Sequence, residues 1–209
     1  MAFRDACAPQ ARVAVIVGLG NPGERYAATR HNAGFLAIDL LAARAGAAGR
    51  VLEDAWVAEA RLGELDLRLV KPLSYMNRSG EPVARLLAAL GMAPADLVVV
   101  LDDVALPLGT VRVRPRGGAG GHHGLRSLVE VLGTEEFPRV RIGVRTGELP
   151  DELADYVLAG VPPDEEPPFR EAVTRAADAV LCLLQEGVAT AMNRFNAAPR
   201  PAPAEDPPA

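Results

Sequence analysis

The sequence predicts a single α/β domain in which a mixed, mostly parallel, twisted sheet is flanked by helices on both faces. Strand-like and helix-like hydrophobic patterns alternate along the chain. The run 97–101 is continuously apolar, which is typical of a parallel strand buried on both faces. With 49% apolar and 23% charged residues, the 209-residue chain has the composition of an ordinary globular protein. We therefore expect one domain over 13–196, between a flexible N-terminal extension (1–12) and a disordered, proline-rich tail (197–209).

The first half of the chain predicts two helices and four strands. The expected elements are a strand at 13–17, a helix over 35–45, a hairpin of strands 55–62 and 65–71, a helix over 80–90 and a strand at 97–101. Gly46 or Gly49 should end the first helix, and Gly91 should end the second. The side chain of Ser79 is expected to cap the second helix.

The second half of the chain predicts two more strands and three more helices. The expected elements are a strand at 111–114, a helix over 125–132, a strand at 140–144, a long helix over 169–184 and a short one over 191–195. Cys7 and Cys182 are too far apart in the sequence to indicate a disulfide framework or a metal site, so Cys182 should pack in the core. No run reaches the length of a membrane span, which predicts a cytoplasmic protein.

The charge of the chain is uneven. A net charge of −5 argues against a nucleic-acid-binding protein when taken globally. Between residues 112 and 145, however, basic residues outnumber acidic ones. The arginines of this region are Arg112, Arg114, Arg116, Arg126, Arg139, Arg141 and Arg145, against Glu130, Glu135 and Glu136. Two interpretations stay open: a basic face on an acidic protein, or scattered solvated arginines.

The turn from Gly18 to Gly23 follows the first strand and matches the dinucleotide-binding pattern G-x-G-x-x-G. Two features speak against a dinucleotide-dependent enzyme. No helix pattern starts at the third glycine, and the acidic residue about 20 positions on, Asp39, falls inside a helix instead of after a second strand. We interpret the glycines as allowing a tight turn and close approach of the backbone to a substrate.

His31 opens the first helix, and Asp102 follows the apolar strand 97–101. In an α/β sheet both belong to the carboxyl edge, where ligands bind. A helix start disfavours the imidazolium, whereas a nearby carboxylate would favour it and select the tautomer. We therefore predict that His31 acts as a base near neutral pH. The alternatives are an inert polar His31, and an Asp102 or Asp103 that only starts a turn.

Two further segments carry polar groups suited to a site. Asn77 offers a neutral donor for an oxyanion and Tyr75-Met76 an apolar support for a stacked base, although Asn77 could also be only a turn former. The glycine-rich loop 117–124 contains His122 and His123. Adjacent histidines can bind a metal, but no cluster of Cys, His and Asp completes a site in the sequence, so none is predicted.

Taken together, these motifs resemble the bacterial peptidyl-tRNA hydrolase family from about 13 to 196. The matching segments, in order, are GLGNPG, RHNAG, KPLSYMNRSG, DDVALPLG, GGAGGHHGL and RVRIGV. The resemblance implies a monomeric, metal-independent α/β hydrolase without a cofactor. It also implies cleavage of the ester between a peptide and the terminal ribose of tRNA, so that prematurely released peptidyl-tRNA is recycled for translation. The implied partner is peptidyl-tRNA, bound through its acceptor stem and 3′ end, with no membrane and no obligate protein partner.

The resemblance also implies roles for individual residues. His31 matches the base that activates a water, and Asp102 the carboxylate that orients it. Asn21 and Asn77 match asparagines that hold the substrate, with Asn77 the better candidate for stabilising the oxyanion. Met76 matches a residue that lines the pocket. Arg114 and Arg141 match basic residues that bind tRNA phosphate, and the further expected substrate-binding residues are Tyr26, Tyr75, His122, His123 and Arg126.

The chain departs from the family pattern at two positions. His123 stands where asparagine is usual, which predicts altered or pH-dependent substrate binding. Ala105 stands where an acidic residue is common. The competing hypothesis from another class is a non-catalytic RNA-binding relative of the same fold, which His123 favours and the retention of His31 with Asp102 opposes.

Overall fold

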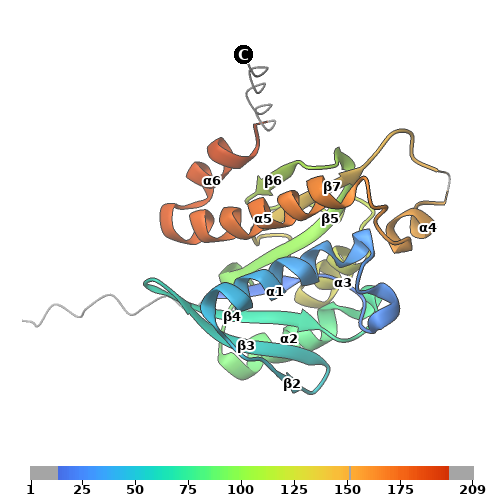
Figure 1. The fold of residues 1–209 in the computed structure, drawn as a ribbon. Helices are drawn as coiled ribbons and strands as arrows, with labels where there is room; N and C mark the ends of the chain where they lie inside the picture. The colour runs from blue at the N-terminus through green and yellow to red at the C-terminus, as the bar shows by residue number, and fades with distance from the viewer. Residues whose placement is uncertain (1–13, 151, 198–209) are drawn as a thin grey trace, which may run out of the picture.

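A seven-stranded sheet forms the centre of this computed structural model, which describes residues 14–150 and 152–197. The sheet order is β2-β3-β4-β1-β5-β7-β6, from one edge to the other (Figure 1). The strands are β1 (Ala14–Gly18), β2 (Arg50–Leu52), β3 (Ala55–Leu62), β4 (Leu65–Pro72), β5 (Leu97–Pro107), β6 (Val111–Arg114) and β7 (Arg139–Arg145). The expected N-terminal extension, Cys7 and all but the first residue of the expected tail lie outside the described residues.

Strand pairing makes the sheet mixed, as predicted. The four central strands β4, β1, β5 and β7 run parallel to one another. The outer pairings, β2 with β3, β3 with β4, and β6 with β7, are antiparallel. The parallel character therefore belongs to the centre of the sheet, where both faces are buried.

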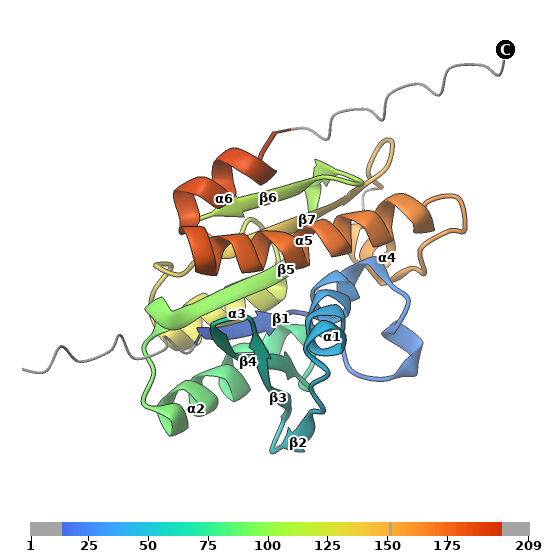
Figure 2. The ribbon, with the colours of Figure 1, turned by 60° about the vertical axis from the view of Figure 1, so that its left-hand side comes forward.

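Helices cover both faces of the sheet (Figure 2). The helices are α1 (Ala33–Ala45), α2 (Gly80–Leu90), α3 (His123–Leu132), α4 (Leu153–Leu158), α5 (Glu166–Glu186) and α6 (Val188–Phe195), and short 3-10 turns are η1 (Glu24–Tyr26), η2 (Arg30–Asn32), η3 (Met76–Arg78) and η4 (Pro94–Asp96). One core contains α1, α5 and α6, including the buried Cys182 that was expected there. The other contains α2 and α3. In the described part of the chain, no helix has both the length and the apolar character needed to cross a membrane.

The ends of the first two helices were predicted correctly, but one cap was not. Gly46 and Gly91 both adopt the left-handed conformation directly after α1 and α2. Ser79 precedes α2, but its hydroxyl donates to the carbonyl of Met76, 2.9 Å away, and does not cap the helix. The hydroxyl of Ser127 from α3 accepts the first amide of α2 at Gly80 instead, at 3.0 Å. A contact between helices therefore replaces the local cap.

β5 is longer than the apolar run that predicted it. Asp102 and Asp103 do not end the strand, because they continue the ladder opposite Ile142 and Gly143 of β7. The ladder excludes the alternative that these aspartates only start a turn. Asp102 thus lies inside a central strand, where pairing with Ile142 of β7 holds its backbone.

The glycines after β1 serve packing between β1 and the start of α1. A Cβ added to Gly18 would lie 2.2 Å from the carbonyl oxygen of Gly34, and one added to Gly20 would lie 2.6 Å from the Phe35 ring. The close approach of Gly18 and Gly20 is therefore to α1, and an approach of this turn to a substrate stays a prediction. Gly23 is followed by a short 3-10 turn and not by a long helix, so the structural context of a dinucleotide-binding motif is also missing.

Candidate active site

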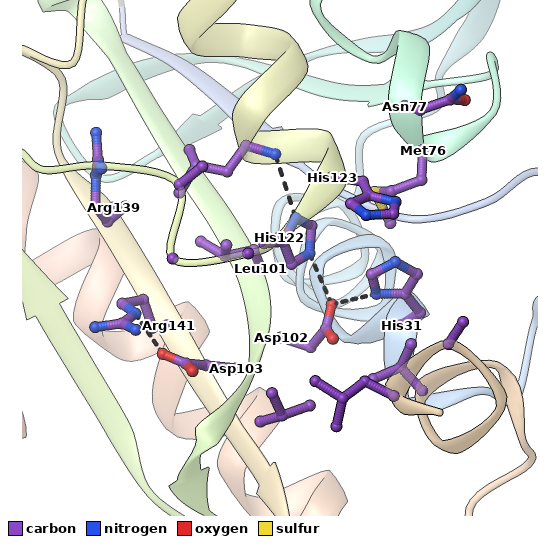
Figure 3. A pocket seen from close by; sticks show the side chains of 18 of the residues that line it. His31, Met76, Asn77, Leu101, Asp102, Asp103, His122, His123, Arg139 and Arg141 are labelled. Atoms are coloured by element: carbon purple, nitrogen blue, oxygen red, sulfur yellow. Dashed lines mark hydrogen bonds and ion pairs between the residues drawn. The ribbon is translucent and has the colours of Figure 1, made fainter. Parts of the chain in front are cut away.

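A cavity of about 860 Å³ lies at the carboxyl ends of β1 and β4 and beside β5. Most of the residues expected in the site line it. They are Asn21, Tyr26, His31, Tyr75, Met76, Asn77, Asp102, Arg114, His122, His123 and Arg141. Arg126 lies exposed on α3 and does not line this cavity. The motifs that are separated in the sequence thus meet around one space (Figure 3).

His31 and Asp102 form a buried pair. His31 Nδ1 lies 2.8 Å from Asp102 Oδ1, and the aspartate is only 2% exposed. Since a carboxylate can only accept, Nδ1 carries the proton and Nε2 keeps its lone pair. Burial lowers the pKa of His31, but the charge and hydrogen bond of Asp102 outweigh it, so this pKa is raised above its ordinary value. Burial alone would raise the pKa of Asp102, but both neighbouring imidazoles hold it well below its usual range.

His122 is a second partner of the same carboxylate oxygen. Its Nε2 lies 3.1 Å from Asp102 Oδ1, and its Nδ1 accepts the backbone N–H of Leu125 at 3.2 Å. Accepting at Nδ1 requires the proton on Nε2, which therefore donates to Asp102. The sequence predicts a contact of His122 with the substrate, whereas in the structure its ring contacts the carboxylate of Asp102. Its position immediately before a helix was the sequence signal for the Leu125 contact, because that is where side chains accept helix amides.

The three side chains also form a potential ligand set for a metal ion. The ligating atoms of His31, Asp102 and His122 lie within 4.8 Å of one another, so the expectation that no such cluster is completed is wrong. The tautomer of His122 disfavours metal binding, however. A metal on Nε2 of His122 would move the ring proton to Nδ1, where it would face the N–H of Leu125. The donor set as it stands is therefore suited to proton transfer and fits a metal poorly.

Asn21 is fixed by a reciprocal pair of hydrogen bonds with Asn32. The Asn21 amide N–H donates to Asn32 Oδ1 at 2.8 Å, and Asn32 Nδ2 donates to the Asn21 carbonyl at 3.0 Å. Asn21 Oδ1 accepts the backbone N–H of Met76 at 2.9 Å. With its oxygen engaged, Asn21 has its NH₂ group as the donor that it can offer to the cavity. Asn32 was not singled out from the sequence as a site residue, because only the folded chain brings its side chain against residue 21.

Asn77 and its neighbours differ in how firmly they are held. Asn77 is exposed, and Figure 3 shows its amide directed away from the imidazole of His31. Tyr75 is also exposed. Met76 is buried, and a Cβ added to Gly124 would lie 2.4 Å from its sulfur. Met76 therefore forms a fixed wall of the cavity, while Tyr75 and Asn77 lie at its rim.

The far end of the cavity is lined by arginines and by the loop 117–121. Arg139 is buried and donates to the carbonyl oxygens of Glu135 (2.9 Å), Phe137 and Gly117. It thereby anchors the loop. From the sequence, Arg139 is only one member of the basic region, because its three acceptors are backbone atoms that a residue pattern does not reveal.

Arg30, next to His31, connects the site to α4 and α5. Its guanidinium pairs with Glu165 Oε2 at 2.5 Å and lies over the ring of Tyr156, 4.5 Å from the ring centre. The hydroxyl of Tyr156 in turn donates to the carbonyl of Val144 at 2.7 Å. This partly buried network was not predicted, because Arg30 lies more than one hundred residues from the other members in the sequence.

Comparisons with known proteins point in one direction. The family model for peptidyl-tRNA hydrolase matches residues 15–203. The chain is 47% identical over 189 residues to a peptidyl-tRNA hydrolase of Symbiobacterium thermophilum, covering 87% of this chain and 98% of the relative. It is 48% identical over 186 residues to that of Chloroflexus aurantiacus, again covering 87% and 98%. The crystal structure of the peptidyl-tRNA hydrolase of Acinetobacter baumannii superposes with a TM-score of 0.83 at 34% identity, covering 91% of this chain and 98% of that one.

Proposed function

This chain belongs to the peptidyl-tRNA hydrolase family, and from that premise we propose that it releases tRNA from peptidyl-tRNA with His31 as the base. It is a hydrolase, and the reaction is cleavage of the ester between the peptide and the terminal ribose. The observation that carries the assignment of the base is the contact of Asp102 Oδ1 with both imidazoles. That contact leaves Nε2 of His31 free to accept a proton.

The proton follows a simple path in this mechanism. Nε2 of His31 takes a proton from a water molecule while the water oxygen forms a bond to the ester carbonyl carbon. Asp102 stabilises the imidazolium that results, through the contact at 2.8 Å. When the tetrahedral intermediate collapses, the bond to the ribose oxygen breaks and that oxygen takes the proton back from His31. The products are the free carboxylic acid and a tRNA with both ribose hydroxyls restored.

Two side-chain amides can stabilise the negative charge that develops on the carbonyl oxygen. The NH₂ group of Asn21 is pre-organised by its bonds to Asn32 and Met76, and a donor fixed in advance loses little free energy in reorganisation. Asn77 is the donor that the sequence favours, and its exposed side chain must turn toward the substrate to act. We propose that both contribute, with Asn21 fixed and Asn77 recruited.

The arginine end of the cavity binds the nucleic acid. Arg114 of β6 and Arg141 of β7 line the same space as His31 and can contact phosphates of the acceptor stem and the 3′ end. Tyr26 and Tyr75 also line the cavity, and the exposed ring of Tyr75 can support a terminal base. Arg126, outside the cavity, would contact the stem further away. As the resemblance to the family implies, we further propose that the protein acts as a monomer in the cytoplasm.

His123 is the residue by which this chain should differ in substrate binding. It begins α3, is exposed and lines the cavity, so its ring can touch a bound substrate. An imidazole in place of an amide changes which groups it can donate to and accept from. Substrate affinity should therefore differ between this protein and its His123→Asn variant.

The uncharged amides that line the cavity favour substrates whose amino group is blocked. A free ammonium at the amino acid would lose its hydration among neutral amides such as those of Asn21 and Asn77. An acylated amine carries no charge, so it loses less hydration free energy when it enters the cavity. We therefore expect the enzyme to cleave peptidyl-tRNA and to spare aminoacyl-tRNA.

The decisive experiment measures release of N-acetyl-aminoacyl groups from tRNA by the metal-stripped protein. Unblocked aminoacyl-tRNA and the His31→Ala variant are run in parallel. We expect cleavage of the blocked substrate only, and its loss in the variant. Full hydrolysis by His31→Ala would refute the mechanism, and salt-sensitive tRNA binding without any hydrolysis would favour the non-catalytic RNA-binding alternative.

A further inference from the structure

Asp103 contacts one of the cavity arginines. β5 and β7 run parallel, with Leu101 opposite Arg141 and Asp103 opposite Gly143. Since side chains alternate along a strand, Asp103 and Arg141 lie on the same face of the sheet, one step apart. Both line the cavity, and Asp103 Oδ2 forms an ion pair with Nε of Arg141 (Figure 3).

The two partners are held very differently. The Asp103 side chain is 7% exposed, and its other oxygen, Oδ1, accepts the backbone N–H of Ala105 at 2.9 Å. Arg141 is 26% exposed, and its Nη2 lies near Gly120, where an added Cβ would be 3.9 Å away. The carboxylate is therefore the fixed member, and the guanidinium reaches from it toward the glycine-rich loop and the cavity.

This division of contacts suits an arginine that binds phosphate. Asp103 uses Nε, so the two terminal nitrogens stay available for a bidentate contact with a phosphate. A long side chain that is already anchored loses less conformational freedom when it binds. We propose that Asp103 is a positioning residue, which holds Arg141 in the orientation that binds a phosphate of the tRNA. This inference rests on the proposed function, in which Arg141 contacts the tRNA.

A second arginine of the cavity, Arg116, has an acidic partner that is not buried, unlike the partner of Arg141. Arg116 also pairs with an acid, Glu136, at 3.1 Å, but both side chains are about two-thirds exposed, at 67% and 64%. Exposed pairs of this kind hold their partners weakly. Glu136→Gln is thus a matched control: it removes a carboxylate from a cavity arginine without removing a buried anchor.

The sign of the effect separates positioning from charge. A carboxylate beside a phosphate site repels the phosphate, so if only charge mattered, its removal would strengthen tRNA binding. If Asp103 positions Arg141, its removal weakens binding. Asp103→Asn is the suitable change, because the amide oxygen can still accept from Ala105 while an uncharged NH₂ group would replace the charged Oδ2 beside the Arg141 guanidinium.

The experiment measures the dissociation constant of deacylated tRNA over a range of salt concentrations for the full-length protein. For Asp103→Asn we expect binding about tenfold weaker and a salt slope smaller by about 1, as when one phosphate contact is lost. Arg141→Ala should show the same, and the double variant should bind no more weakly than Arg141→Ala. Glu136→Gln should stay within about twofold of the wild type.

Arg141→Lys gives an independent test that leaves Asp103 in place. Lysine keeps the positive charge but has a single nitrogen, which cannot pair with Asp103 through one group and hold a phosphate through two others, as arginine can. We expect Arg141→Lys to bind tRNA as weakly as Arg141→Ala. Wild-type binding by Arg141→Lys would overturn the positioning role, as would tighter binding by Asp103→Asn, or a loss from Asp103→Asn that persists in the Arg141→Ala background. If Arg141→Ala itself leaves the affinity and the salt slope unchanged, the phosphate contact in the proposed function is wrong, and the role of Asp103 is overturned with it.

Discussion

The two ends of the cavity differ in how exposed their functional side chains are, although Arg139 and Asp103 are buried at the arginine end. At the catalytic end, Asp102 is 2% exposed and holds His31 and His122 through one oxygen. At the arginine end, Arg114 is exposed and Arg116 is 67% exposed. Proton transfer requires heavy atoms within hydrogen-bond distance in a defined orientation, whereas attraction between a cation and a phosphate tolerates more movement. The comparison predicts that substitutions at the first end lower turnover, while those at the second lower affinity.

His31→Ala should have the largest effect and gives the strongest test of the comparison. Loss of a general base lowers kcat/KM by about 10²–10⁴-fold. Because His31 is not among the proposed phosphate contacts, the affinity of the variant for deacylated tRNA should stay close to that of the wild type. Steady-state hydrolysis of N-acetyl-aminoacyl-tRNA and equilibrium tRNA binding measure the two quantities. A large loss of tRNA affinity would show that the two ends are not separate.

Asp102→Asn should show how charge at the catalytic end sets the pH dependence. The neutral form of His31 is the base, so activity of the wild type should rise with pH through a midpoint above about 6.5, the ordinary histidine pKa. Without the carboxylate the cause that raises the pKa is gone and burial still lowers it, so the midpoint should move to lower pH.

The high-pH plateau of Asp102→Asn should fall by about 10–10²-fold, less than for His31→Ala, because an imidazole without its carboxylate is a weaker and less well oriented base. The measurement is kcat/KM from pH 5 to 9. An unchanged midpoint would mean that Asp102 does not control the protonation of His31.

Asn77→Ala should reduce kcat by up to about 10²–10³-fold and leave measurable activity, because the fixed amide of Asn21 remains as a second donor. Asn21→Ala is the matched comparison at the rigid position. Single-turnover rates at saturating enzyme separate chemistry from binding. An increase in KM alone for Asn77→Ala would assign the oxyanion to Asn21 and leave Asn77 as a binding residue.

Arg114→Ala should have the smallest effect on turnover and a clear effect on binding. We expect weaker tRNA affinity and a salt slope smaller by about 1, because one phosphate contact is lost. The kcat should stay near that of the wild type, because Arg114 is exposed and takes no part in the proton transfer. Filter binding at several salt concentrations measures the slope. An unchanged slope would remove Arg114 from the phosphate contacts.

Local pattern was enough for much of the fold. The hairpin of β3 and β4 and the ends of α1 and α2 at Gly46 and Gly91 follow from alternation and from glycine conformation, which neighbouring residues determine. β2 and α4 were missed, because three and six residues are too few for a periodic signal.

The candidate site divides in the same way. The order of the motifs identified the family and the pair of His31 with Asp102 from the sequence by itself. Only the tertiary structure decided that β5 continues through Asp103, that His122 shares the oxygen of Asp102, and that Arg139 anchors the glycine-rich loop. These depend on the register between strands and on backbone acceptors brought together from distant parts of the chain. Such contacts exist only after folding has closed the loops between them, so no local pattern of residues can record them.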